Sequence, residues 1–325
     1  MNRIILVLLG LILIVPIVKG QDFKPGCELS LQLKSLRQKQ KIDSACATAG
    51  DGSSASKEQN RAKNNFCAVG PATQLTVTDL KNLYAMTATR LTDAGIPFGS
   101  PASIPPNRNA LTQTFTLSNG KSLAEGKLVS IVAFVLGARH SNLSNGEKVN
   151  CNETGRKNND IHIELVARRD SDSCNSITAE ISPHFRPDDW DRFDDYEFTH
   201  PVMMIGNLFF DASHRPCSGV GTAHEKRIHP TRISSWEIHP VYAIFVCKNS
   251  TIAACPARDT AKWVPFNEWL KLPDDKDTDD PVNSPSEPAN ANHLEARRTA
   301  PITQHESDAL RIVLKRRWRP LRVSA

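Results

Sequence analysis

Five apolar or alternating stretches in the central part of the chain have the pattern of β-strands. The first, 127–137, is a long run rich in β-branched residues, whereas 161–166 and 177–182 alternate strictly between apolar and polar positions. Stretches 202–210 and 236–246 complete the series. Alternation with a period of two places successive side chains on opposite faces of a strand. The pattern therefore predicts five strands.

Helices are predicted before and within this strand series. Residues 78–94 carry apolar residues at helical spacing, with Thr78 as the candidate N-cap and Gly95 at the end. Segment 187–193 begins with proline and carries two aromatic residues three positions apart, which predicts a short helix. Leucines over 29–36 predict a further helix near the N-terminus.

These elements follow the order of an OB-type barrel, in which one helix lies between the third and fourth of five strands. We therefore predict a mainly β, α+β protein whose five-stranded OB-like barrel is preceded by a helical N-terminal segment. The chain divides into residues 1–20 as a signal peptide, 21–110 as a Cys-containing helical segment and linker, 111–270 as the OB-like barrel domain, and 271–325 as a disordered acidic, proline-containing linker and basic tail.

The N-terminus has the three parts of a secretory signal peptide. A short basic start, Met1–Arg3, precedes the apolar run 4–18, and a small residue lies directly before Gln21. The run is shorter than the ~20 residues that a transmembrane helix usually needs. We expect a secreted or periplasmic protein, with an uncleaved N-terminal anchor as the alternative.

The cysteine content agrees with export, because an even number of cysteines in an exported protein indicates disulfides. The chain has 8 cysteines, all beyond the predicted signal peptide. They are Cys27, Cys46, Cys67, Cys151, Cys174, Cys217, Cys247 and Cys255. The sequence leaves their pairing open. Because three precede residue 70 and five follow residue 150, full pairing requires at least one bridge between these two regions.

Basic charge is concentrated at the C-terminus. The last fifteen residues contain six basic and no acidic residues, whereas residues 21–310 are net acidic. We expect this tail to be a disordered soluble end, with contact to an anionic surface, either phosphates or a membrane, as the alternative.

Seven acidic or histidine side chains lie on polar strand faces or at strand ends. In 161–166, for example, the polar positions share the face opposite the isoleucines. The set of ligand-binding candidates is Asp160, His162, Glu180, Asp211, His214, Glu237 and His239.

Two interpretations of this set remain open. Imidazole and carboxylate groups suit zinc, iron or manganese, so the first is a metal or acid–base site with His162, His239 and Glu237 as ligands. Glu180 or Glu237 would then be a ligand or a base. The second is an ordinary solvated or hydrogen-bonded strand face. The sequence contains no dense ligand motif such as His-Glu-x-x-His, and it specifies no cofactor.

Other chemistries have less support in the sequence. OB barrels often bind nucleic acids through their second and third strands, but 161–166 and 177–182 contain no aromatic residue and the body is net acidic. This composition argues against nucleic acid as a partner of the barrel. The sequence also contains no Gly-x-Ser-x-Gly nucleophile motif.

Four short motifs of the strand series resemble those of a group of exported bacterial proteins without a characterised function. They are Asn159-Asp-Ile-His-Ile-Glu-Leu, Ala179-Glu-Ile-Ser-Pro, Ile205-Gly-Asn-Leu-Phe-Phe-Asp-Ala-Ser-His and Trp236-Glu-Ile-His-Pro-Val. The resemblance covers about residues 120–247. It implies an OB-like barrel and draws attention to the same polar positions, but it brings no activity.

The leading functional hypothesis is an exported, disulfide-stabilised, non-catalytic binding or envelope-associated domain, whose partner is an unknown ligand or envelope component. The alternative is a metal-dependent hydrolase, with phosphoesters as one substrate class, that uses the histidine and carboxylate cluster on the barrel strands. Whether the protein is an enzyme stays open at this stage.

Overall fold

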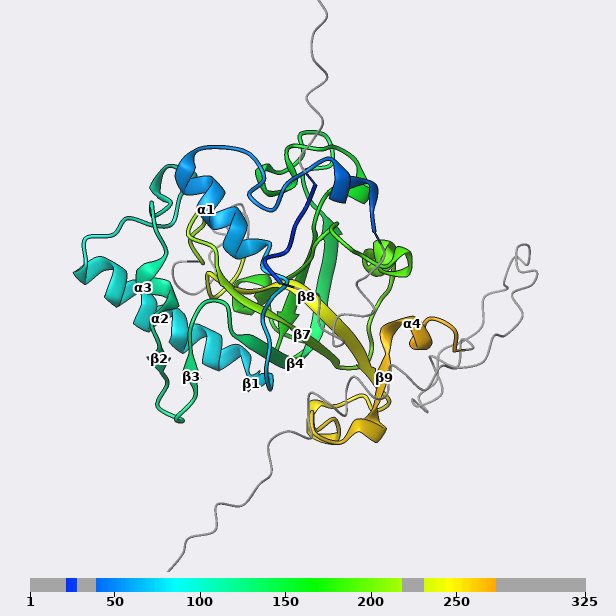
Figure 1. The fold of residues 1–325 in the computed structure, drawn as a ribbon. Coiled ribbons are helices and arrows are strands. Elements are labelled where there is room, and N and C mark those ends of the chain that lie inside the picture. The colour runs from blue at the N-terminus through cyan, green and yellow to red at the C-terminus, as the bar shows by residue number, and fades with distance from the viewer. Residues whose placement is uncertain (1–21, 28–38, 218–230, 273–325) are drawn as a thin grey trace, which may run out of the picture.

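The computed structural model describes residues 22–27, 39–217 and 231–272, and its central feature is a closed barrel of five strands (Figure 1). The strands are β4 (Leu128–His140), β5 (Ile161–Val166), β6 (Ile177–Ile181), β7 (Val202–Phe210) and β8 (Trp236–Cys247). They pair in the order β4-β5-β6-β8-β7, and β7 also pairs with β4, which closes the barrel. Only β6 and β8 run parallel within it. This order confirms the predicted OB-like barrel.

The observed strands lie close to the predicted ones. β5 and β7 have the predicted bounds, and β4 continues to His140, with a register shift between Val135 and Gly137. The helix between β6 and β7 is a 3-10 helix, Asp188–Asp195. Alternation therefore located the strands accurately, because each strand has one face in the barrel core.

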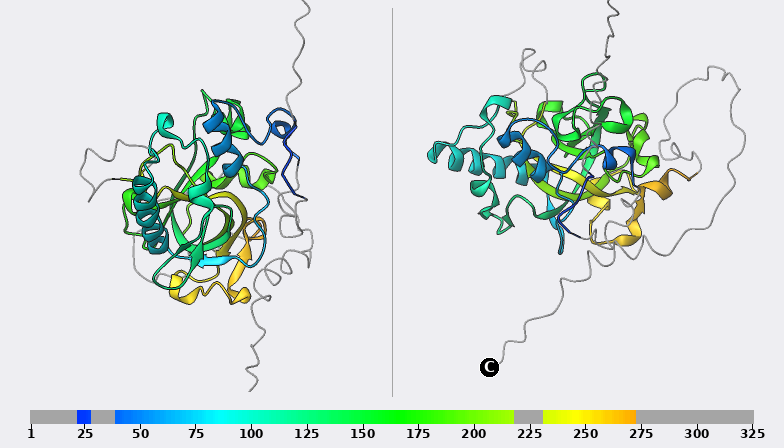
Figure 2. Two further views of the ribbon diagram at one scale, coloured as in Figure 1. Left: turned by 60° about the vertical axis from the view of Figure 1, so that its left-hand side comes forward. Right: turned by 45° about the horizontal axis from the view of Figure 1, so that its top comes forward.

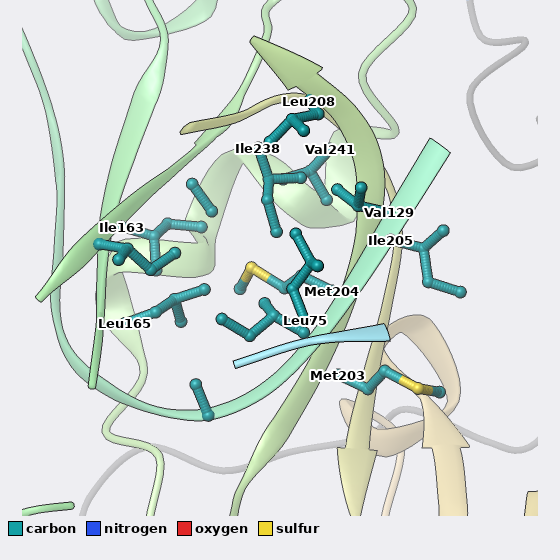
Figure 3. Packing of buried hydrophobic residues seen from close by; sticks show 14 of the residues in the cluster. Leu75, Val129, Ile163, Leu165, Met203, Met204, Ile205, Leu208, Ile238 and Val241 are labelled. Carbon is teal, nitrogen blue, oxygen red and sulfur yellow. The ribbon is translucent and has the colours of Figure 1, made fainter. Parts of the chain in front are cut away.

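Apolar side chains from alternate strand positions fill the barrel interior. Figure 3 shows Ile163, Met204 and Ile238 pointing toward its middle, whereas Met203 and Ile205 lie on the other side of β7. Ile163, Met204 and Ile238 are all fully buried. Because the interior is apolar, the alternate polar positions of β5, β6 and β8 lie on the outside of the barrel wall.

Helices and short strands surround the barrel (Figures 1 and 2). The helices are α1 (Ser54–Lys63), α2 (Val77–Asp93), α3 (Asn109–Thr112) and α4 (Phe266–Trp269). β1 (Thr73–Leu75) pairs with β4, β9 (Trp263–Pro265) pairs with β8, and β2 (Phe115–Thr116) forms a hairpin with β3 (Ser122–Leu123). The further 3-10 helices are Lys41–Ser44, Pro101–Ser103, Lys148–Asn150, Arg156–Asn158, Ser173–Asn175, Ile252–Ala254 and Thr260–Lys262.

α2 confirms the predicted long helix but begins earlier than expected. Its N-cap is Thr76 rather than Thr78, because the Thr76 side chain accepts from the backbone of Asp79 and the Asp79 carboxylate accepts from the backbone of Thr76. This reciprocal pair is a capping box. Leu80 and Leu83 of the helix are fully buried, so α2 packs firmly on the protein core.

All eight cysteines form disulfides, which fits an oxidising, extracytoplasmic environment. The bridges are Cys27–Cys67, Cys46–Cys151, Cys174–Cys217 and Cys247–Cys255. Cys46–Cys151 confirms the prediction of a bridge between the N-terminal segment and the later part of the chain. Among the described helices, none has both the length and the apolar character to cross a membrane.

Several predictions concern segments outside the described residues. They are the signal peptide, the helix at 29–36, and the linker and basic tail from residue 273 onward.

Candidate functional site

A pocket of about 810 Å³ opens on the outside of the barrel wall. Its base is formed by polar positions of β5, β6 and β8, namely His162, Glu180 and Glu237. α1 lines it with Lys63 and neighbouring polar side chains, while residues 139–149 and the turn after β7 supply further lining. The pocket therefore lies where three strands present polar side chains and three other segments cover them.

The register of the barrel strands brings the predicted site residues together. His162 of β5 pairs directly with Glu180 of β6, and Ala179 pairs with Ile238 of β8. Glu237 and His239 flank Ile238, so they project on the same outer side of the wall as Glu180. The face assignment from alternation is thus correct for β5, β6 and β8.

The polar face is buried rather than solvated. Asp160 and His239 are 0% exposed, Glu237 is 1% exposed and Glu180 is 2% exposed. This burial excludes the solvated form of the second interpretation for these four residues and leaves both the hydrogen-bonded form and a binding site open. Alternation places a side chain on a face, but it does not show what covers that face.

The Lys63 ammonium lies among the buried acids. Lys63 Nζ is 2.8 Å from Glu180 Oε2 and 3.2 Å from Asp160 Oδ2. Burial alone would lower the pKa of Lys63, but attraction to Glu180 and Asp160 raises it well above its ordinary value. Burial likewise opposes ionisation of the acids, yet the nearby cations lower the pKa of Glu180 to about 2 and that of Asp160 further still. Lys63 is therefore a built-in counter-cation.

His239 is held by the same lysine residue. Its Nδ1 lies 2.6 Å from the backbone carbonyl of Lys63, and because a carbonyl only accepts, Nδ1 donates. Its Nε2 then faces Asp160 Oδ2 at 3.3 Å and Glu180 Oε2 at 3.4 Å. The C-terminal residue of α1 thus fixes the orientation of the imidazole ring.

A second group surrounds His162. Its Nε2 lies 3.0 Å from Ser141 Oγ, 3.4 Å from Glu147 Oε1 and 3.5 Å from Glu180 Oε1. Burial lowers the pKa of His162, but the two carboxylates outweigh burial and raise it to about 9. In a serine hydrolase triad the carboxylate bonds the imidazole nitrogen opposite the serine. Here the serine and both carboxylates contact the same nitrogen, so the group lacks triad geometry.

Arg232 organises the remaining candidates. It donates through Nη2 to Asp211 Oδ2 at 2.7 Å and through Nη1 to Glu237, while His214 Nδ1 lies 2.7 Å from the same Asp211 oxygen. Burial raises the pKa of Glu237 to about 8, helped by the charge of Glu180 and opposed by Arg232. Arg232 Nε and Glu237 Oε2 have no hydrogen-bond partner among the residues that the structure describes.

The predicted metal ligands do not form one ligand set. The described residues contain two groups of possible metal ligands, and within each group the donor atoms lie within 4.8 Å of one another. The groups are Glu147–Asp160–His162 and Asp160–Glu180–His239. His162 and His239 belong to different groups, and Glu237 belongs to neither. In the second group, Lys63 already supplies a positive charge to both carboxylates. The chemistry of the donors fits a divalent cation, but the position of Lys63 competes with it.

The sequence analysis missed Lys63, Ser141, Glu147 and Arg232. α1 escaped detection because the residues it buries are polar, Ser56, Gln59 and Asn60. The sequence feature that could have revealed α1 is its N-cap residue, Ser53, whose side chain accepts from the backbone N–H of Ser56. The other missed residues lie outside the strands, where no periodicity places them.

Comparison of the chain with protein-family models, curated proteins and solved structures finds no match. The resemblance to exported bacterial proteins therefore stays an expectation from the motifs.

Proposed function

We propose that this protein is an exported, disulfide-stabilised binding domain, and that its ligand site is the pocket over β5, β6 and β8. The observation that carries the proposal is a pocket of about 810 Å³ whose base consists of buried charged side chains. This volume falls within the ~300–1,000 Å³ of typical small-molecule sites. Clusters of perturbed, buried ionisable groups in a pocket are characteristic of functional sites.

Non-catalytic binding is favoured by the way these groups are used. Lys63 and Arg232 are ion-paired inside the protein, and His162 contacts two carboxylates and a hydroxyl through one nitrogen. Each contact fixes a side chain in place, and the serine and carboxylates around His162 lack the arrangement of a nucleophile with an oriented base. Such an arrangement suits a rigid recognition surface.

A metal-dependent hydrolase remains the second candidate, supported by the two donor groups that share Asp160. In that case Asp160 would hold the metal together with either Glu147 and His162 or Glu180 and His239, and the metal would act as a Lewis acid or generate hydroxide. Lys63 would have to leave Asp160 and Glu180 for the second group to bind a cation. The two candidates differ in whether the protein carries metal.

The binding proposal is tested by closing the pocket. Asn145 lines it, is exposed and does not have a left-handed backbone, so Asn145→Trp adds bulk without backbone strain. Asn175→Trp makes the same change at an exposed position outside the pocket lining. Saturation-transfer NMR with a defined mixture of sugars, sugar phosphates, amino acids and dicarboxylates should detect binding to the wild type and to Asn175→Trp, but not to Asn145→Trp. Absence of binding, or equal binding to both variants, would contradict the proposal.

A further inference from the structure

The charges at the base of the pocket are already matched with one another. Lys63 pairs with Asp160 and Glu180, and Arg232 pairs with Asp211 and also donates to Glu237, whose raised pKa of about 8 favours the neutral acid at pH 7. Breaking a buried pair leaves an uncompensated charge and costs several kcal/mol. An ionic ligand would have to compete for one of these partners, whereas an uncharged polar ligand would leave the pairs intact.

Hydrogen-bonding capacity remains at the same base. Among the described residues, neither Arg232 Nε nor Glu237 Oε2 has a hydrogen-bond partner, and both residues line the pocket. Both atoms are shielded from solvent, so a ligand in the pocket would supply the missing partner only after a small shift of these two side chains. A hydroxyl group serves both, because it accepts from a guanidinium N–H and also bonds to a carboxyl oxygen in either protonation state.

Besides the charged side chains of Arg139 and Lys148, the pocket wall contains amide and apolar side chains. Asn142, Asn145 and Asn152 of one loop line it, as do the apolar side chains of Pro101 and Ile104. Amides offer both a donor and an acceptor, which suits a ligand that carries many hydroxyl groups. An apolar patch beside them suits the C–H face of a sugar ring.

We propose that the pocket binds a neutral saccharide, whose hydroxyl groups bond to the internally paired base and to the amide wall. This inference rests on the proposed function, because it takes the pocket to be a ligand site. It specifies the ligand further by excluding molecules with a net charge. A charged ligand would bind more weakly because it would disrupt the buried ion pairs of Lys63 and Arg232.

Isothermal titration calorimetry with matched sugars tests this inference. The probes are neutral mono- and disaccharides, each compared with its uronic acid and its amino-sugar analogue. We expect a neutral member to bind, and its charged analogues to bind on the order of tenfold more weakly or worse. Glu237→Met should weaken binding of the neutral sugar, whereas Glu197→Met, at an exposed position outside the pocket lining, should not. If Glu237→Met does not fold, Asn145→Trp serves as the pocket variant.

The outcomes separate the two proposals. If a charged analogue binds better than the neutral sugar, and Asn145→Trp abolishes that binding, the saccharide inference is overturned and the binding site stands. If no sugar binds but amino acids or dicarboxylates of the NMR mixture do, the inference is likewise overturned and the binding site stands. If nothing binds in either experiment, or if Asn145→Trp binds as the wild type does, both proposals fail.

Discussion

Removal of the Lys63 ammonium should destabilise the protein strongly, because two buried carboxylates depend on it. Lys63→Met keeps most of the length of the side chain and a similar helix propensity at the end of α1, so the change is mainly one of charge. It leaves Asp160 Oδ2 and Glu180 Oε2 without the cation that lies 3.2 and 2.8 Å away.

The structure sets the expected magnitude. The side chains of Asp160 and Glu180 are 0% and 3% exposed, so water does not replace the lost ammonium. Removing one partner of a buried pair costs about 3–5 kcal/mol of stability. Because the Lys63 side chain is itself 16% exposed, we expect the lower part of this range at pH 7.

The loss should depend on pH in a defined direction. The folded pKa of Glu180 is about 2, below its ordinary value of 4.5, so its ionised form contributes stability above about pH 4.5 that is lost as the pH falls toward 2. Without Lys63 this pKa rises, and protonation in the folded state removes the unpaired charge. The difference between wild type and Lys63→Met is therefore largest at neutral pH and shrinks below about pH 4.5.

Urea unfolding followed by tryptophan fluorescence at pH 7 and pH 4 measures both effects. Lys81→Met provides the control, because Lys81 is an exposed residue of α2. A loss below about 1 kcal/mol at pH 7, equal to that of the control, would refute the counter-cation role. A loss that does not shrink at pH 4 would refute its electrostatic origin.

Three further predictions concern bonds, protons and metal. Replacing the Cys46–Cys151 bridge by serines should lower the urea midpoint more than replacing Cys247–Cys255, because their sequence separations are 105 and 8; the reverse order would contradict the loop-closure argument. His162, whose pKa is raised to about 9, contributes up to about 3 kcal/mol below pH 6.5 that is lost as the pH rises through 9. His162→Asn should flatten the urea-midpoint curve over this range, and an unchanged slope would count against the assignment. Elemental analysis should find no stoichiometric zinc, iron or manganese, and a chelator should not shift the melting temperature; a metal lost with chelator would favour the hydrolase.

The barrel was predictable because the pattern of apolar and polar residues that defines each strand lies within one short stretch of sequence. Strand 161–166 alternates strictly, and its period alone separates the core-facing isoleucines from His162. The order of elements then sufficed for an OB-like topology, which the pairing of β6 with β8 and of β4 with β7 bears out. Even the polar face was found, since Glu180 and Glu237 occupy the alternate positions.

The chemistry of the site was less predictable because its partners come from distant segments. Lys63 precedes Asp160 by 97 positions in the printed sequence, and it belongs to a helix without an apolar stripe. Arg232 pairs with Asp211, which lies 21 positions earlier in the sequence. No periodic signal links such residues, so the sequence indicated carboxylates and histidines but not the cations that neutralise them.

The Cys46–Cys151 bridge also explains how the pocket keeps its shape. Cys46 precedes α1, and Cys151 follows the loop that forms the opposite wall. The same two segments are joined by Asn60 of α1 and by Asn64, which caps the end of α1; their amides donate to the carbonyl oxygens of Lys148 and Val149. A pocket whose walls are fixed to each other loses little conformational entropy when a ligand binds. The bridge that ties the N-terminal segment to the barrel therefore preorganises the site as well, which is the behaviour expected of a recognition domain.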